Sequence, residues 1–178
     1  MRTLIAGLLA GLAMFVWAAL AHVVLPLGEV GVSRLPHEAD MRGALHAAIG
    51  EAAGLYVFPS EMNAKPGPSG FLVYNPGNVT GITPPVLGGE LVAEVVQSLI
   101  AAALVGVALI SGYWRRVGFV ALIGVAAALS TSGSYWLWYR FPTDYTLGYM
   151  FVDLVRYVVA GLVIAALVKP RASPAAIA

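Results

Sequence analysis

The stretch that decides the fold is VVQSLIAAALVGVALISGYW (95–114), followed by RR (115–116) and VGFVALIGVAAALSTSGSYWLWY (117–139). The first run has 20 residues and the last has 23, and neither contains Asp, Glu, Lys or Arg. A helix needs about 20 mostly apolar residues to cross a bilayer. Backbone amides that face lipid must be hydrogen-bonded within the chain, so both runs are expected to be helices. We therefore predict a transmembrane hairpin with Arg115 and Arg116 in its tight turn.

Two further apolar runs stand near the ends of the chain. Residues 3–25 contain no Asp, Glu, Lys or Arg. In residues 145–168, the only charged side chains are those of Asp153 and Arg156. The first run could instead be a signal peptide cleaved after Ala19-Leu20-Ala21, but its apolar part exceeds the about 7–15 residues of a signal core. We expect an uncleaved anchor. The expected segments are transmembrane helices at 1–25, 89–114, 117–139 and 144–168, an extracytoplasmic cap at 26–88 and a cytoplasmic tail at 169–178.

Composition supports a membrane protein and excludes several other classes. Of the 178 residues, 60% are hydrophobic and 11% are charged, whereas soluble domains carry about 25% charged residues. The net charge of +1 does not favour electrostatic binding of nucleic acid. With no cysteine, the chain has neither disulfides nor thiolate metal sites. We predict an all-α membrane protein, a four-transmembrane-helix bundle with a small extracytoplasmic α+β cap between helices 1 and 2.

Basic residues in the short connections set the expected orientation. All of the following lie on one side of a four-span chain: Arg2, Arg115, Arg116, Lys169 and Arg171. Short loops rich in Lys and Arg stay in the cytoplasm, so both termini are expected inside. The aromatic residues at 135–139 then fall at the outer membrane surface, where Trp and Tyr are enriched.

The expected cap contains one helix and one hairpin. Pro36 is expected to open a helix with Glu38 and Asp40 in its first turn, where the helix dipole favours acids. Gly50 or Gly54 is expected to end it. Its apolar residues recur at helical spacing: Met41, Leu45, Ala48 and Ile49. The runs LYVFP (55–59) and FLVY (71–74) are typical of strands that could pair as a hairpin. Their aromatic side chains are expected to pack on one another or on Trp136 and Trp138.

Three further segments are distinctive. They are Trp17 with Ala21-His22 and LPLGE (25–29), LYVFP (55–59) with FLVY (71–74), and YWLWYRFP (135–142) with YTLG (145–148). Together they resemble a family of small bacterial inner-membrane proteins with four transmembrane helices. The resemblance implies a topology and a bacterial inner membrane, and it implies no chemistry.

The polar residues of the spans gather at one depth. Counted from the basic residues at 1.5 Å per residue, they lie about 20–31 Å outward, in the outer third of the membrane core. This candidate polar layer comprises His22, Glu94, Gln97, Ser132, Asp153 and Arg156. A charge inside the membrane costs at least about 2.5–3.5 kcal/mol near the centre. We therefore expect Arg156 to pair with Asp153 on its own helix or with Glu94 across the bundle.

Two interpretations of this layer remain open. The polar groups could satisfy one another and set the helix register, or they could line an outward-facing pocket for the polar head of a lipid-like or quinone-like molecule. Small residues four apart, at Gly7 and Gly11 and at Ser98, Ala102 and Gly106, predict close helix packing within the bundle.

Recognisable catalytic motifs are missing from the sequence. His22, His37 and His46 lack the spacing of a helical zinc site, and there is no nucleophile elbow or phosphate loop. No cofactor is expected. The leading hypothesis is a non-enzymatic accessory, structural or complex-associated membrane protein. The alternative is a binder or transporter of a small lipid-like molecule. The expected partners are the lipid bilayer and another membrane protein or complex, and not nucleic acid.

Overall fold

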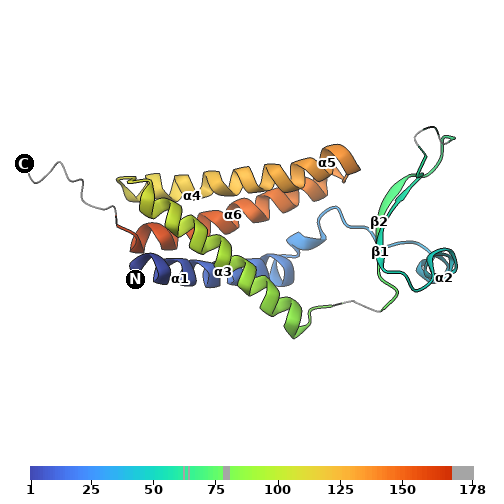
Figure 1. Ribbon diagram of the computed structural model, residues 1–178, viewed down its shortest axis with the longest axis horizontal. Coiled ribbons are helices and arrows are strands. Elements are labelled where there is room, and N and C mark those ends of the chain that lie inside the picture. Colours follow the sequence, from blue (N-terminus) through green and yellow to red (C-terminus); the bar gives the residue numbers. More distant parts are fainter. Residues whose placement is uncertain (62, 64, 78–80, 170–178) are drawn as a thin grey trace, which may run out of the picture. The chain divides into compact units, whose positions relative to one another are not determined.

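Four long helices dominate the protein (Figure 1). The computed structural model describes residues 1–61, 63, 65–77 and 81–169. The chain divides into a helical unit, made of residues 1–31 and the chain from 83 onward, and a small unit of residues 32–82. The tail at 170–178, with Arg171, lies outside the described residues.

Each helix of the helical unit is long and apolar enough to cross a membrane. The segments are α1 (Arg2–Ala19) with a π-helical turn (Leu20–Val24), α3 (Pro84–Val107), α4 (Tyr113–Ala128) with a π-helical turn (Leu129–Gly133) and α5 (Ser134–Tyr139), and α6 (Thr143–Leu167). The prediction of four spans is confirmed in length and composition. The two π-helical turns were not expected from the sequence.

The boundaries of the second span differ from the prediction. Helix α3 begins at Pro84, where proline is favoured because its missing N–H is not needed in the first turn, and it ends at Val107. The turn to α4 lies at 108–112 and ends at Gly112, which has φ +89°. Arg115 and Arg116 are therefore in the first turn of α4 and not in the connection. The sequence argument missed this because residues 108–114, like the part of α3 before them, carry no charged side chain.

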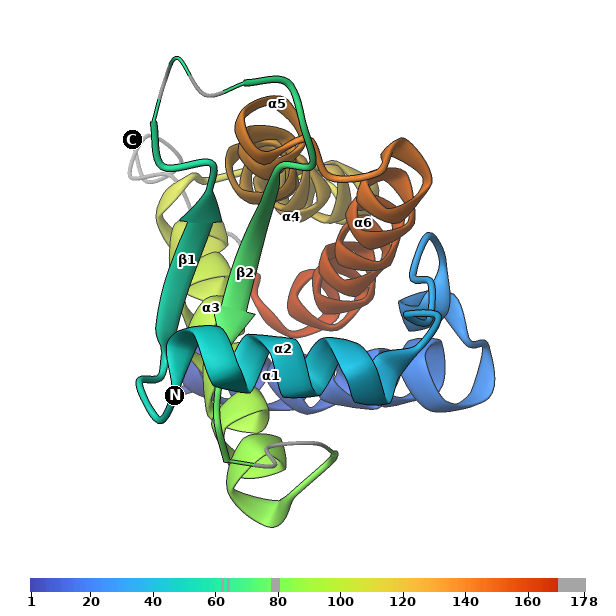
Figure 2. The same cartoon turned by 90° about the vertical axis from the view of Figure 1, so that its right-hand side faces the viewer.

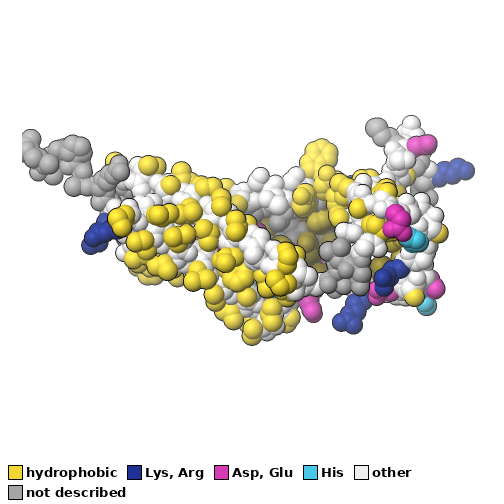
Figure 3. All heavy atoms as spheres, turned by 60° about the horizontal axis from the view of Figure 1, so that its bottom comes forward, with side chains coloured by type: hydrophobic (Ala, Val, Ile, Leu, Met, Phe, Trp, Pro, Cys, Tyr) yellow, Lys and Arg dark blue, Asp and Glu magenta, His cyan; other side chains and the backbone are white. Residues whose placement is uncertain are grey.

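The helices pack in two pairs. Helix α3 packs mainly on α1, α4 packs mainly on α6, and α1 and α6 join the pairs. Helices α3 and α4 diverge beyond their connecting turn (Figures 1 and 2). The core is built from small and aliphatic side chains of all four helices: Ala6, Ala10, Met14, Ala101, Ala102, Val105, Val120, Tyr157, Ala160, Ile164 and Val168. Much of the remaining surface of these helices is apolar, as one face shows in Figure 3.

Glycines bring α1 and α3 into close contact. A Cβ atom at Gly7 would lie 2.9 Å from the Leu99 Cα, and one at Gly11 would lie 2.6 Å from the Val95 Cα. These distances leave no room for a side chain. The prediction that Gly7 and Gly11 serve packing within the bundle is confirmed.

The unit of residues 32–82 holds α2 (Glu38–Ile49), β1 (Gly54–Phe58) and β2 (Gly70–Tyr74). Helix α2 ends at Gly50, whose φ of +74° favours glycine. The strands pair antiparallel with Tyr56 opposite Leu72, and the rings of Tyr56 and Tyr74 meet edge-on at 6.3 Å. The expected helix, hairpin and aromatic contact are all present.

None of the described side chains of this small unit is buried. Of the expected apolar face of α2, only Leu45 and Ile49 are partly buried, while Met41 is 43% exposed and Ala48 is exposed. Leu55, Val57 and Val73 are also more than half exposed. About 50 residues make a marginal hydrophobic core, and this unit has scarcely one.

Candidate functional site

Four charged side chains of α3 and α6 form the most unusual feature of the helical unit. The Arg156 Nη1 atom lies 2.8 Å from Glu94 Oε1, 3.7 Å from Glu90 Oε1 and 3.8 Å from Asp153 Oδ1. We call Glu90, Glu94, Asp153 and Arg156 the polar cluster. Spacing along each helix explains it, since Glu90 and Glu94 are one turn apart on α3, and Asp153 and Arg156 are one turn apart on α6. The expected pairing of Arg156 is confirmed, and Glu94 on the other helix is its closest partner.

Exposure decreases steadily through the polar cluster. The side chain of Glu90 is 46% exposed, that of Asp153 25%, that of Arg156 14%, and that of Glu94 0%. The pair at the buried end is thus the one with the shortest N–O distance. Burying ions is costly unless they are paired with good geometry, so the Arg156–Glu94 ion pair ties α3 to α6.

Hydrogen bonding leaves part of this buried pair unsatisfied. Within the described residues, neither carboxylate oxygen of Glu94 has a partner with hydrogen-bond geometry, although Oε1 makes the ion pair with Arg156. The Nε atom of Arg156 also lacks an acceptor there. Most buried polar groups in native structures are hydrogen-bonded. Glu94 Oε2 is therefore a buried acceptor to which no group of the described residues donates.

A second set of polar contacts adjoins the polar cluster, one turn beyond Glu94 on α3 and at the residue after Arg156 on α6. The Tyr157 hydroxyl donates to Gln97 Oε1 at 2.9 Å, again joining α6 to α3. The buried Ser98 hydroxyl donates to the Gly7 carbonyl oxygen at 2.7 Å, joining α3 to α1. These bonds satisfy their groups within the protein, so this second set is structural.

The other two predicted residues of the layer lie apart from these bonds. His22 is exposed in the first π-helical turn, and its Nδ1 lies 2.9 Å from the Ala18 carbonyl oxygen. A carbonyl only accepts, so Nδ1 carries the hydrogen in that bond. Ser132 lies in the second π-helical turn, and no ion pair of the polar cluster involves it. The sequence argument placed it by depth alone, which says nothing of the direction in which a side chain points.

Sequence reasoning missed a contact made by Trp17. Its indole Nε1–H donates to the Val152 carbonyl oxygen of α6 at 3.0 Å. The neighbouring residue along α6 is Asp153, so this bond joins α1 to α6 beside the polar cluster. An indole in the middle of an apolar run needs an acceptor, and that requirement was the signal in the sequence.

A series of aromatic rings lies at the N-terminal end of α6. Successive ring centroids are 5.5, 5.6, 4.9 and 6.1 Å apart in the order Tyr135, Phe141, Tyr145, Tyr149 and His22. Tyr149 is four residues before Asp153, so both lie on one face of α6. The Tyr149 ring of this series is therefore one helical turn from Asp153 of the polar cluster.

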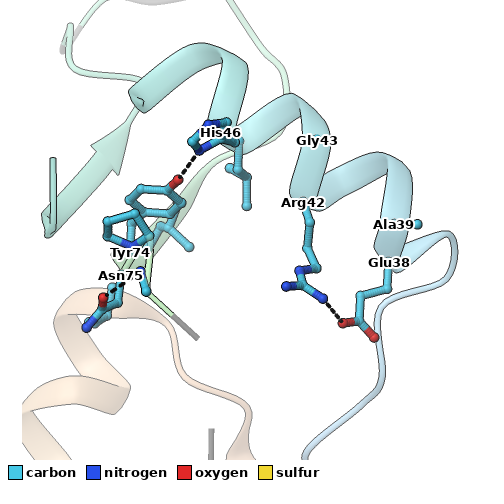
Figure 4. A pocket seen from close by; sticks show the side chains of 12 residues that line it. Glu38, Ala39, Arg42, Gly43, His46, Tyr74 and Asn75 are labelled. Atoms are coloured by element: carbon cyan, nitrogen blue, oxygen red, sulfur yellow. Dashed lines mark hydrogen bonds and ion pairs between the residues drawn. The ribbon is translucent and has the colours of Figure 1, made fainter. Parts of the chain in front are cut away.

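Two cavities of the protein are lined by residues outside the polar cluster. One of about 510 Å³ lies between the second π-helical turn, α5 and α6, with the Trp136 indole donating to Thr143 Oγ1 at its rim. The other, of about 700 Å³, lies in the small unit between α2 and the end of β2 (Figure 4). In it, Arg42 pairs with Glu38 at 3.7 Å, and the Tyr74 hydroxyl donates to the Gly50 carbonyl oxygen.

The described residues contain no group of three or more His, Asp or Glu side chains that could hold a metal ion. Comparisons with protein-family models, with curated proteins and with solved structures find no match to the chain.

Proposed function

We propose that the chain is a multi-pass protein of the bacterial inner membrane with both termini in the cytoplasm. Arg2 begins α1, Arg115 and Arg116 begin α4, and Lys169 follows α6. Arg116 also donates to the Ala165 carbonyl oxygen near the end of α6, which fits basic residues gathered at one end of the bundle. The positive-inside rule assigns that end to the cytoplasm. The small unit of residues 32–82 then faces the periplasm, as a cap.

On this proposal, the whole chain acts as a non-enzymatic accessory or complex-associated membrane protein. The observation that carries the proposal is the buried Arg156–Glu94 ion pair, which joins α6 to α3. Buried polar pairs can specify a unique helix arrangement at some cost in stability. The cap, with no side chain buried among its described residues, has surface to offer a protein partner.

Native mass spectrometry after gentle detergent extraction tests this role. We expect a protein that co-purifies in a fixed ratio with the wild type. Replacing residues 36–77 by a flexible Gly-Ser linker should remove that protein while leaving the four helices intact. A partner retained by the linker variant would argue against recognition through the cap, and the finding of a small molecule alone would contradict the accessory role.

A second candidate function is the binding or transport of a small lipid-like molecule. One observation favours it, namely the buried Glu94 Oε2 without a hydrogen-bond partner among the described residues. In the same mass spectra this function would appear as a stoichiometric small molecule.

A further inference from the structure

The polar cluster carries more negative charge than one guanidinium can balance. Three carboxylates face a single Arg156, which leaves a formal charge of −2 when all four groups are ionised. Such an excess is unfavourable where water is scarce, because charge repulsion grows as the dielectric constant falls. We infer that Glu90 and Asp153, beside the Arg156–Glu94 pair, bind the ammonium group of an amine. The inference rests on the membrane placement proposed above and gives the second candidate function its chemistry.

Glu94 supplies an observation that is independent of the charge count. Its side chain is fully buried and is directed at Arg156, yet Oε2 has no hydrogen-bond partner among the described residues. A buried acceptor without a donor costs about 1–3 kcal/mol. An ammonium group has three N–H donors and no acceptor. It therefore adds the donors and the positive charge that the polar cluster lacks, and it adds no further acceptor.

Access to the polar cluster is through its two outer acids. Glu90 and Asp153 are 46% and 25% exposed, and each lies almost 4 Å from Arg156, beyond hydrogen-bond distance. Arg156 therefore holds neither acid by a hydrogen bond, and both side chains are partly open to a ligand. Glu94 keeps its shorter contact with Arg156 and holds the guanidinium in place.

The geometry favours an organic cation over a metal ion. The described residues offer no group of ligands that could hold a metal, and the Arg156 guanidinium among the acids would repel a compact dication. An amine also has a hydrocarbon part, which suits the aromatic rings beside the site. Tyr149 lies one turn before Asp153 on the same face of α6 and packs on Tyr145 at 4.9 Å, and aromatic faces attract cations.

The ammonium group could belong to an ethanolamine lipid headgroup or to a soluble amine. Both offer the same donors to Glu90 and Asp153. A lipid would in addition place its acyl chains against the exposed apolar surface of the helices. The test therefore has one arm for each source.

The experiment measures the thermal unfolding of the full-length protein in dodecyl maltoside. The probes are dioleoylphosphatidylethanolamine, dioleoylphosphatidylglycerol with the same acyl chains but no amine, and free ethanolamine balanced against sodium chloride. An amine at about ten times its dissociation constant should raise the midpoint by about 3–6 °C. A shift with the ethanolamine lipid alone identifies a lipid ligand, and a shift with free ethanolamine identifies a soluble one.

Matched variants test whether the shift in unfolding midpoint depends on Glu90 and Asp153. Combining Glu90→Gln with Asp153→Asn removes both outer charges and keeps the side-chain size, and it should abolish the shift. Each single substitution should reduce the shift, which keeps the test valid if the double variant does not fold. Glu29→Gln removes an exposed acid of the same unit that lies outside the polar cluster, and it should leave the shift unchanged.

Several outcomes would overturn the inference. Equal shifts with the ethanolamine and glycerol lipids would show that the amine is not recognised, and a shift retained by the double variant would place the binding elsewhere. If no amine has an effect, and acidification stabilises the wild type but not the double variant, protons offset the charge and no amine site exists. None of these results bears on the proposed partner, since the mass-spectrometry test uses neither Glu90 nor Asp153.

Discussion

Replacing Arg156 by leucine should be among the most destabilising single substitutions in the helical unit. The change leaves Glu94, which is 0% exposed, without its counter-charge. Removing one partner of a buried ion pair typically costs about 3–5 kcal/mol. Replacing both partners by apolar residues is often neutral, so Arg156→Leu combined with Glu94→Leu should be less harmful than Arg156→Leu alone.

The structure also ranks the acids around Arg156. Between 2.8 Å for Glu94 and 3.8 Å for Asp153, the Coulomb energy falls by only about a quarter at equal dielectric constant. Burial separates the two acids further, because Asp153 is 25% exposed and Glu94 is not exposed at all. We expect a coupling energy of at least about 2 kcal/mol between Arg156 and Glu94 and of less than about 1 kcal/mol between Arg156 and Asp153.

The assay is a double-mutant cycle of unfolding free energy. Unfolding in mixed micelles of dodecyl maltoside and sodium dodecyl sulfate can be followed by circular dichroism of the helices. The matched control is the exposed pair Arg42–Glu38 on α2, which has side chains 69% and 68% exposed. That pair should show a coupling energy of only about 0.3–0.5 kcal/mol.

Two results would refute the reasoning. If Arg156→Leu and Glu94→Leu are additive within about 0.5 kcal/mol, the two residues do not stabilise one another and the polar cluster is not a connected network. If the coupling with Asp153 exceeds that with Glu94, burial does not decide which acid is the principal partner.

Three further predictions concern topology, packing and the cap. Cysteine at Ser60 should react with an impermeant maleimide in intact cells and cysteine at Ser173 only after permeabilisation, and the reverse pattern would invert the proposed orientation. Gly11→Ala should destabilise the protein by about 1–3 kcal/mol, because its Cβ would lie 2.6 Å from the Cα of a residue on α3. Gly118→Ala has open space around its Cβ and should be tolerated. Equal losses of stability in the two variants would refute the close packing. Protease added from the periplasmic side should cut first within residues 60–70, and rapid cutting across the whole cap would show that its helix and hairpin are not stably folded.

Local properties of the sequence determined the four helices that are long and apolar enough to span a membrane, and the hairpin of the unit of residues 32–82. Length and hydropathy suffice for a transmembrane helix, because the membrane imposes one thickness and requires every backbone group to be hydrogen-bonded. Short apolar and aromatic runs bounded by Pro and Gly likewise predicted β1 and β2. The need of Arg156 for an acid also followed from sequence, since an unpaired charge at that depth is too costly.

Only the tertiary structure decided which residues meet. Depth along a helix is a one-dimensional measure, so it could gather six polar residues at one level without saying which face each occupies. The rotation of α3 against α6 brings Glu94 to Arg156 at 2.8 Å and leaves Ser132 outside the polar cluster's ion pairs. The end of α3 at Val107 was equally hidden, because the turn that follows has no charged residue to mark it. Hydropathy measures how well each residue suits the membrane, whereas partner choice depends on helix packing, which is set by contacts between residues far apart in the sequence.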